Sequence, residues 1–285
     1  MCDKDHFAES VKEYEARGLI TRRQFGMLVA AGVAMALPES ADAQATAERE
    51  VEIKTPDGTA DAYFVYPAAG SGAAVLVWPD IFGLRPAMRT MGKRLAGAGY
   101  SVLVVNPFYR VGKTNFTGAT PFGQITPFRK GMNRDTDMSD AKAFIAWLDA
   151  QPQVNKNRKI GTQGYCMGGP MTFHTAAAVP DRVGAVASFH GGGLVGKEGD
   201  PNSPHLLAAA TKASFLIAIA ENDDKGRPNE KTVLKETFDK AKLFSEIEVY
   251  PAAHGWCPPD TQVYNEPQAE KAWARLLALY KQALA

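Results

Sequence analysis

Gly164-Tyr165-Cys166-Met167-Gly168-Gly169 joins two segments of different character. Residues 160–165 are expected to form a strand, and residues 167–178 follow a helical pattern. A cysteine flanked by glycines at a strand-to-helix turn matches the nucleophile elbow, in which a strained turn lifts the reactive side chain above the sheet. The helix would also favour a thiolate there. Cys166 is therefore the candidate nucleophile, the alternative being a buried, inert cysteine.

The alternation of strand and helix continues on both sides of this turn. Two short strands at 51–55 and 60–66 are expected to pair antiparallel around Pro56-Asp57-Gly58. Further strands are expected at 73–78, 101–105, 160–165, 183–189, 215–220 and 246–250. Helices are expected at 86–98, 138–148, 167–178, 230–242 and 267–284, and a long loop at 106–135. This order predicts an α/β fold whose central sheet is mainly parallel, with helices on both faces.

An acid and a histidine follow later strands. Glu221-Asn222-Asp223-Asp224 comes after the strand at 215–220, and His254 comes after the strand at 246–250. Nucleophile, acid and base in this order are the arrangement of α/β-hydrolases. His254 is the candidate base, and Asp223 is favoured over the adjacent Asp224 as the residue that orients it, from its loop position alone.

Four stretches resemble the dienelactone hydrolase family, a branch of the α/β-hydrolases that uses cysteine in place of serine. They are Pro-Asp-Ile-Phe-Gly-Leu at 79–84, Gly-Tyr-Cys-Met-Gly-Gly at 164–169, Ala-Glu-Asn-Asp at 220–223 and Tyr-Pro-Ala-Ala-His-Gly-Trp at 250–256. The likeness extends over essentially all of 44–285. It implies a cofactor-free hydrolase of the α/β-hydrolase fold that acts on a small ester or lactone, with Cys166, His254 and Asp223 as its triad.

The resemblance also implies roles around the triad. The backbone N–H groups of Ile81 and Met167 would form the oxyanion hole. At the position of Asp80, relatives hold a glutamate that contacts the resting thiol and moves when substrate arrives. The same gating role is expected of Asp80, whose side chain is shorter than that of glutamate. Tyr109, Arg110 and Trp256 are further candidates for substrate binding.

The sequence leaves the charge of the substrate open. Relatives that act on dienelactone hold its carboxylate with arginines, one of them a few residues after the catalytic histidine. Here that stretch reads Trp256-Cys257-Pro258-Pro259, without arginine. Arg110, Lys113 or Arg129 in the long loop could bind an anion instead. The long loop also carries four aromatic residues that are expected to form an apolar cover: Phe108, Phe116, Phe122 and Phe128. Such a cover favours the alternative, a carboxylesterase that acts on neutral esters.

Other features argue against competing functions. With 32 Lys and Arg against 31 Asp and Glu, the net charge of +1 gives no reason to expect nucleic acid as a partner. His190-Gly191-Gly192-Gly193 spells an esterase oxyanion motif, but it follows the nucleophile and is better explained as a turn at a strand end that could line the pocket. Cys257 is expected to be structural, and His6, His174 and His205 show no metal-ligand spacing. A non-catalytic binding or redox protein on the same scaffold remains the alternative of a different class.

The N-terminus is predicted to be a targeting segment rather than part of the fold. Thr-Arg-Arg-Gln-Phe-Gly-Met begins at Thr21, an apolar run fills 28–37, and Ala41-Asp42-Ala43 follows. This order resembles a twin-arginine export signal, and the apolar run is too short for the roughly 20 residues of a membrane span. We expect a signal at 1–43, transient contact with the export machinery, and a periplasmic or secreted single domain at 44–285. A short buried or amphipathic helix is the alternative for this segment.

Overall fold

The structure is a computed structural model that describes residues 16, 37, 43–114, 116–117 and 120–285. The predicted export signal at 1–43 thus lies outside the described residues, except for Ala16, Leu37 and Ala43. None of the helices in the described ranges combines the length and the apolar character that crossing a membrane requires.

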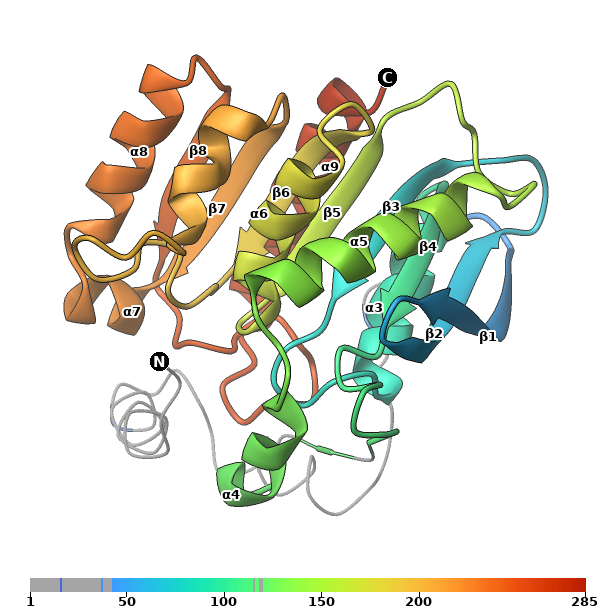
Figure 1. Ribbon diagram of the computed structural model, residues 1–285, viewed down its shortest axis with the longest axis horizontal. Coiled ribbons are helices and arrows are strands. Elements are labelled where there is room, and N and C mark those ends of the chain that lie inside the picture. Colours follow the sequence, from blue (N-terminus) through green and yellow to red (C-terminus); the bar gives the residue numbers. More distant parts are fainter. Residues whose placement is uncertain (1–15, 17–36, 38–42, 115, 118–119) are drawn as a thin grey trace.

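One sheet organises the described part of the chain (Figure 1). Its strands are β1 (Thr46–Thr55), β2 (Gly58–Pro67), β3 (Ala73–Trp78), β4 (Tyr100–Val105), β5 (Ile160–Tyr165), β6 (Val183–Phe189), β7 (Ser214–Ala220) and β8 (Ser245–Tyr250). They lie in the order β1-β2-β4-β3-β5-β6-β7-β8. The β1–β2 and β2–β4 pairs are antiparallel and every later pair is parallel. The carboxyl ends of β3 and β5 to β8 therefore meet at one edge of the sheet.

Helices cover both faces of the sheet, as the sequence predicts. Side chains of α5 (Arg134–Asp149), α6 (Gly168–Ala178) and α8 (Glu230–Lys240) enter the apolar cluster on one face. Those of α3 (Pro86–Gly97) and α9 (Glu266–Ala283) enter the cluster on the other, as Figure 1 shows. The mainly parallel α/β architecture is confirmed.

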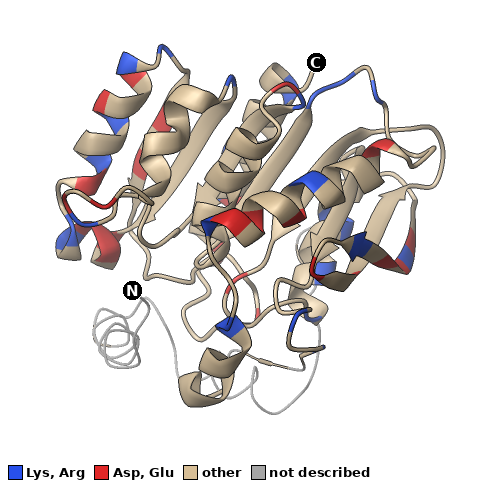
Figure 2. Cartoon of the chain, in the orientation of Figure 1, with Lys and Arg blue, Asp and Glu red and all other residues tan. Residues whose placement is uncertain are grey.

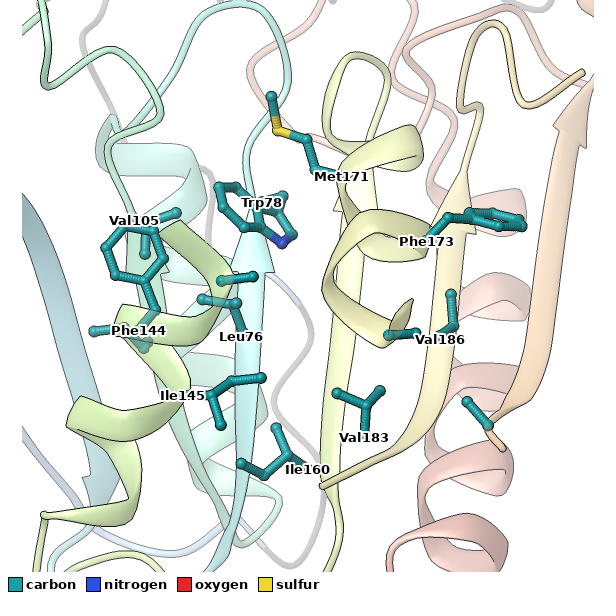
Figure 3. Packing of buried hydrophobic residues seen from close by; sticks show 14 of the residues in the cluster. Leu76, Trp78, Val105, Phe144, Ile145, Ile160, Met171, Phe173, Val183 and Val186 are labelled. Atoms are coloured by element: carbon teal, nitrogen blue, oxygen red, sulfur yellow. The ribbon is translucent and has the colours of Figure 1, made fainter. Parts of the chain in front are cut away.

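The central strands are buried along their whole length because both faces are covered. Every residue of β3, β4 and β5 is buried. Figure 3 shows Phe144 and Ile145 of α5 and Phe173 of α6 on one face of these strands. The Trp78 ring lies 5.7 Å from that of Phe144, and its Nε1 donates to Thr175 Oγ1 at 2.9 Å. Burial of each such side chain contributes about 1.5–3 kcal/mol, which gives the loops at the strand ends a rigid base.

Several boundaries differ from the sequence-based expectations. Strand β1 begins at Thr46 rather than 51, because it pairs with β2 along its full length. Helix α5 begins at Arg134 rather than 138, because Asn133 and Thr136 form a capping box that adds a first turn. The expected loop after β7 is a short helix, α7 (Glu221–Gly226). The long loop contains α4 (Phe122–Ile125) and the 3-10 helix η1 (Thr126–Arg129), and a second 3-10 helix, η2 (Pro204–Ala210), precedes β7.

Candidate active site

Cys166 occupies a strained turn between β5 and α6. Its φ of 51° is in the left-handed region, which non-glycine residues adopt rarely. Its N–H donates to Phe189 O at 3.0 Å, and its carbonyl accepts from Gly169 N at 3.0 Å. The turn is thus fixed from both neighbouring elements, and Cys166 lies at the N-terminal end of α6, where the helix dipole favours a thiolate.

Glycines permit the close approach of backbones around this turn. A Cβ on Gly164 would lie 2.1 Å from Gly168 O, and one on Gly168 would lie 2.4 Å from Trp78 O. Neither backbone position could accept a side chain without moving the strand or the helix. The second contact also brings the start of α6 against the end of β3.

His254 is hydrogen-bonded to Asp223. The distance from His254 Nδ1 to Asp223 Oδ2 is 2.6 Å, and the His254 backbone N–H donates to Asn222 Oδ1 at 2.8 Å. Asp223 lies in the first turn of α7 rather than in a loop. Asp224 points its carboxylate to Lys231 Nζ, with both oxygens at 2.7 Å. Of the two adjacent acids considered from sequence, Asp223 is thus the one in contact with the histidine.

His190 connects the elbow to this pair. It directly follows Phe189, whose carbonyl accepts the Cys166 N–H. Its ring centroid lies 5.1 Å from that of His254 in an edge-to-face arrangement. Cys166, His190 and His254 therefore gather at the carboxyl ends of β5, β6 and β8. Sequence reasoning interpreted His190 as a turn residue and missed this contact.

The two backbone amides proposed from sequence for the oxyanion hole lie on segments that touch. Ile81 belongs to the loop after β3, and Met167 precedes Gly168, whose backbone packs on Trp78 and Pro79. Within the described residues, neither the Ile81 nor the Met167 N–H donates to another protein atom. Both remain available to a negatively charged oxygen.

Asp80 is held by Arg85. The guanidinium donates to both carboxylate oxygens of Asp80, at 2.6 and 2.9 Å, and to both oxygens of Asp260, at 2.8 and 2.6 Å. The Phe82 N–H also donates to Asp80 Oδ1 at 2.9 Å. Burial raises the pKa of Asp80, while the neighbouring guanidinium opposes that shift. The gating role expected of Asp80 would require this carboxylate to leave a bidentate ion pair.

Tyr109 and Arg110 make contacts with the β1–β2 hairpin and α5. Tyr109 OH donates to Asp140 Oδ1 at 2.7 Å. Arg110 donates to both oxygens of Asp140 at 2.8 Å and to Asp57 Oδ2 at 2.6 Å. Two carboxylates therefore already neutralise the guanidinium that was a candidate to bind a substrate anion.

Trp256 and Cys257 are buried directly after His254. Trp256 stacks on Tyr250 with centroids 5.2 Å apart and lies edge-to-face on His190 at 5.0 Å. Burial raises the pKa of the Cys257 thiol well above its usual value. Trp256 thus packs against His190, and burial favours the protonated form of the Cys257 thiol.

An apolar cover adjoins the expected oxyanion hole. Ile81, Phe82, Phe108 and Ile125 are buried together, and a second group packs against them: Phe116, Phe122, Phe128, Met132 and Met167. Figure 2 shows that charged residues concentrate on other parts of the molecule, such as α8, while α4 carries none. Arg129 and Lys113, the remaining loop cations considered from sequence, are both exposed.

Arg85 and Asn222 are further residues of the site that sequence reasoning missed. Asn222 stands directly before Asp223, and a short polar residue in that position was an available signal. Arg85 pairs with Asp260 across 175 positions, which no local pattern reveals. Among the described residues, no group of three or more His, Cys, Asp or Glu side chains is arranged to hold a metal ion.

Comparison with known proteins matches this geometry to one family. The sequence model of the Dienelactone hydrolase family matches residues 60–284. A protein of Methylorubrum extorquens, provisionally named a carboxymethylenebutenolidase, is 29% identical over 291 residues, covering 97% of this chain and 98% of the relative. The carboxymethylenebutenolidase of Rhodococcus opacus is 27% identical over 219 residues, covering 75% and 83%.

The fold comparison agrees. A crystal structure from Klebsiella pneumoniae, provisionally named a dienelactone hydrolase, superposes with a TM-score of 0.74 at 24% identity. The match covers 84% of this chain and 100% of the other. At that identity the match establishes the fold alone, which is the α/β-hydrolase fold.

Proposed function

The chain belongs to the dienelactone hydrolase family of hydrolases, and from that membership we propose that it cleaves an ester or lactone through a thioester on Cys166. The observation that carries the proposal is the 2.6 Å bond between His254 and Asp223, made beside a cysteine held in a left-handed turn at a helix N-terminus. A buried cysteine without a catalytic role would need neither feature.

Acylation would begin with the Cys166 thiolate. Its Sγ attacks the carbonyl carbon, and the negative charge on the carbonyl oxygen is stabilised by the N–H groups of Ile81 and Met167. His254, which holds the thiol proton, donates it to the alkoxide as the carbon–oxygen bond breaks. Asp223 keeps the His254 Nδ1 proton in place and stabilises the imidazolium that forms meanwhile.

Deacylation would reverse these roles with water as the nucleophile. His254 removes a proton from water, the resulting hydroxide attacks the thioester carbon, and the same two amides stabilise the oxyanion. The carbon–sulfur bond then breaks, which releases the carboxylic acid and regenerates Cys166. No cofactor takes part in either half of this cycle.

We further propose that the acyl group is neutral. Two carboxylates neutralise Arg110 and two more neutralise Arg85. In the stretch after His254, Pro258 stands in place of the arginine that the family resemblance implies. The apolar cover beside Ile81 favours a hydrocarbon or aromatic substituent. This favours a carboxylesterase activity on neutral esters and lactones within the same mechanism.

A non-catalytic redox protein is the candidate from another class. Its obvious partner for Cys166 is Cys257, but burial keeps that thiol protonated, and a protonated thiol exchanges slowly. The hydrolase proposal is therefore preferred. Arg22-Arg23 and the apolar run after them support our proposal that the precursor uses the twin-arginine route and that the enzyme acts in the periplasm or outside the cell.

A substrate panel tests this proposal. We expect neutral lactones and short aryl esters to be turned over with kcat/KM at least equal to that of carboxylated dienelactones. A missing charge-assisted bond weakens binding of the anion by about 1.5–3 kcal/mol, or roughly ten- to a hundredfold. A strong preference for the carboxylated lactone, lost in Arg110→Ala or Arg129→Ala, would show that the loop supplies the cation and would refute the neutral-substrate proposal.

A further inference from the structure

His190 is a buried histidine that the mechanism above does not use. It directly follows β6, is 1% exposed and has a φ of 42°. Its backbone N–H donates to Ala218 O at 2.8 Å, so the adjoining strand fixes the backbone. Neither ring nitrogen has a hydrogen-bond partner among the described residues. An imidazole buried in this way is costly and calls for an explanation.

The contacts of the ring supply that explanation. Its centroid lies 5.1 Å from that of His254, 5.0 Å from that of Trp256 and 6.1 Å from that of Tyr165. The first two contacts are edge-to-face, at interplanar angles of 63° and 67°. Aromatic contacts of this kind fix ring orientation. The His254 ring is therefore held both by its hydrogen bond to Asp223 and by its contact with the His190 ring.

The His190 ring is uncharged. Burial lowers the pKa of His190 well below its usual value, and the nearby His254 lowers it further. The titratable groups packed around the ring are His254, with its partner Asp223, and Tyr165 from β5. Cys166 lies at the adjoining turn, where its backbone N–H donates to Phe189 O. A neutral His190 neither repels the imidazolium form of His254 nor competes for its proton.

We propose that His190 is a positioning residue whose ring holds the His254 imidazole in its working orientation and excludes water from one side of it. The inference rests on the proposed function of His254. The ring is what matters in this role, and the backbone conformation explains why a histidine carries it, because histidine enters the left-handed region more readily than most other side chains.

Two substitutions separate the ring from the backbone. His190→Phe keeps an aromatic ring but tolerates the left-handed backbone less well, whereas His190→Asn suits that backbone and removes the ring. Turnover is measured as kcat per active site, with sites counted by burst titration, so that loss of folded protein is not counted as loss of catalysis. His190→Tyr and His190→Ala serve as the second ring-bearing and ring-free variants if either fails to fold.

We expect His190→Phe to retain kcat within about threefold and His190→Asn to lose roughly ten- to a hundredfold, as small misplacements of a catalytic group do. The alkaline limb of the kcat/KM profile, which reports loss of the proton from His254, should move to higher pH in His190→Asn only, because hydration favours the charged imidazolium. A structural role alone would leave that limb in place.

Other results would overturn the proposal. If His190→Asn keeps wild-type turnover and pH profile, His190 does not position His254. If His190→Phe loses as much as His190→Asn, the ring nitrogens rather than the ring are required. Cys166→Ala, assayed in parallel, separates these failures from failure of the proposed function. If it still hydrolyses esters, the triad assignment and the role of His190 fall together.

Discussion

Cys166 and His190 are two residues at which the chain accepts backbone strain beside the candidate triad. Left-handed non-glycine residues cost of the order of 1–3 kcal/mol each and persist where the surroundings determine them. Here the surroundings are the hydrogen bonds to Phe189 and Ala218 on neighbouring strands. The elbow cysteine could be predicted from sequence because its glycines have a fixed spacing. The strained His190 could not, because its ring contacts Tyr165 on β5 and two residues after β8, which are far from it along the chain.

The adjacent acids Asp223 and Asp224 form a matched pair for a test. Asp223→Asn should lower kcat by about 10²–10⁴-fold, because an amide neither stabilises the imidazolium nor fixes its tautomer. Asp224→Asn should stay within about threefold, since its carboxylate binds Lys231 instead. Steady-state kinetics on one neutral ester measures both. Equal losses in the two variants would contradict the assignment of Asp223.

The lowered pKa of His190 predicts a pH dependence of stability. The unfolded histidine takes up a proton near pH 6.5, and the folded one, whose pKa is lowered, does not. This histidine therefore supports stability above pH 6.5, and the support is lost as the pH falls, by up to about 1.4 kcal/mol per pH unit.

Urea unfolding of wild type and His190→Phe at pH 7.5, 6.5 and 5.5 measures that contribution. The free energy of unfolding should fall less steeply toward pH 5.5 in His190→Phe, because the group that titrates on unfolding is gone. Parallel curves for the two proteins would show that His190 is protonated in the folded state.

At the scale of elements, Arg85 joins two loops that border the site. It follows the Ile81 loop and pairs with Asp260 in the segment after His254. The strands and most helices were predictable because hydrophobic periodicity is local. Pairing between distant loops was not, since it depends on how the finished sheet brings strand ends together. The short helix α7 was missed for a related reason, because six residues carry too little periodicity to be recognised.

Removal of Arg85 should be strongly destabilising. Arg85→Met leaves the buried Asp80 carboxylate unpaired, which typically costs about 3–5 kcal/mol. Arg89→Met, in helix α3 that begins directly after Arg85, breaks a more exposed ion pair with Glu50 and should cost no more than about 1 kcal/mol. Thermal and urea unfolding of the two variants would measure this contrast, and equal losses would mean that the Asp80–Arg85–Asp260 pairing contributes little.

For the whole molecule, the sheet explains why the family resemblance was detectable from sequence. Its parallel strands place the elbow, the acid and the histidine at one edge. Each of these motifs directly follows its own strand, so the motifs occur in a fixed order along the sequence. In our proposal the substrate is selected instead by the apolar cover, most of which lies between β4 and α5. That cover comes from a long segment in which aromatic residues meet without regular spacing, as Phe116 and Phe128 do at 5.0 Å.

The proposed export route is also a property of the whole chain. We expect the mature protein to begin near Gln44 and to accumulate in the periplasm. Replacing Arg22 and Arg23 together by lysine should leave the precursor in the cytoplasm, because the twin-arginine pair is read as an address. Cell fractionation and N-terminal sequencing decide the outcome. Unchanged export of the double variant would exclude this route.

Mass analysis after trapping shows whether Cys166 carries the acyl group. The protein from Gln44 onward is mixed with a slowly hydrolysed neutral ester, quenched in acid and digested. His254→Asn, which should deacylate slowly, serves as the trapping variant, and Cys166→Ala serves as the control. We predict one added acyl group, on the peptide that contains Cys166, and none in Cys166→Ala. An acyl group on Cys257 or on a serine, or turnover without any covalent adduct in the trapping variant, would show that Cys166 is not the nucleophile.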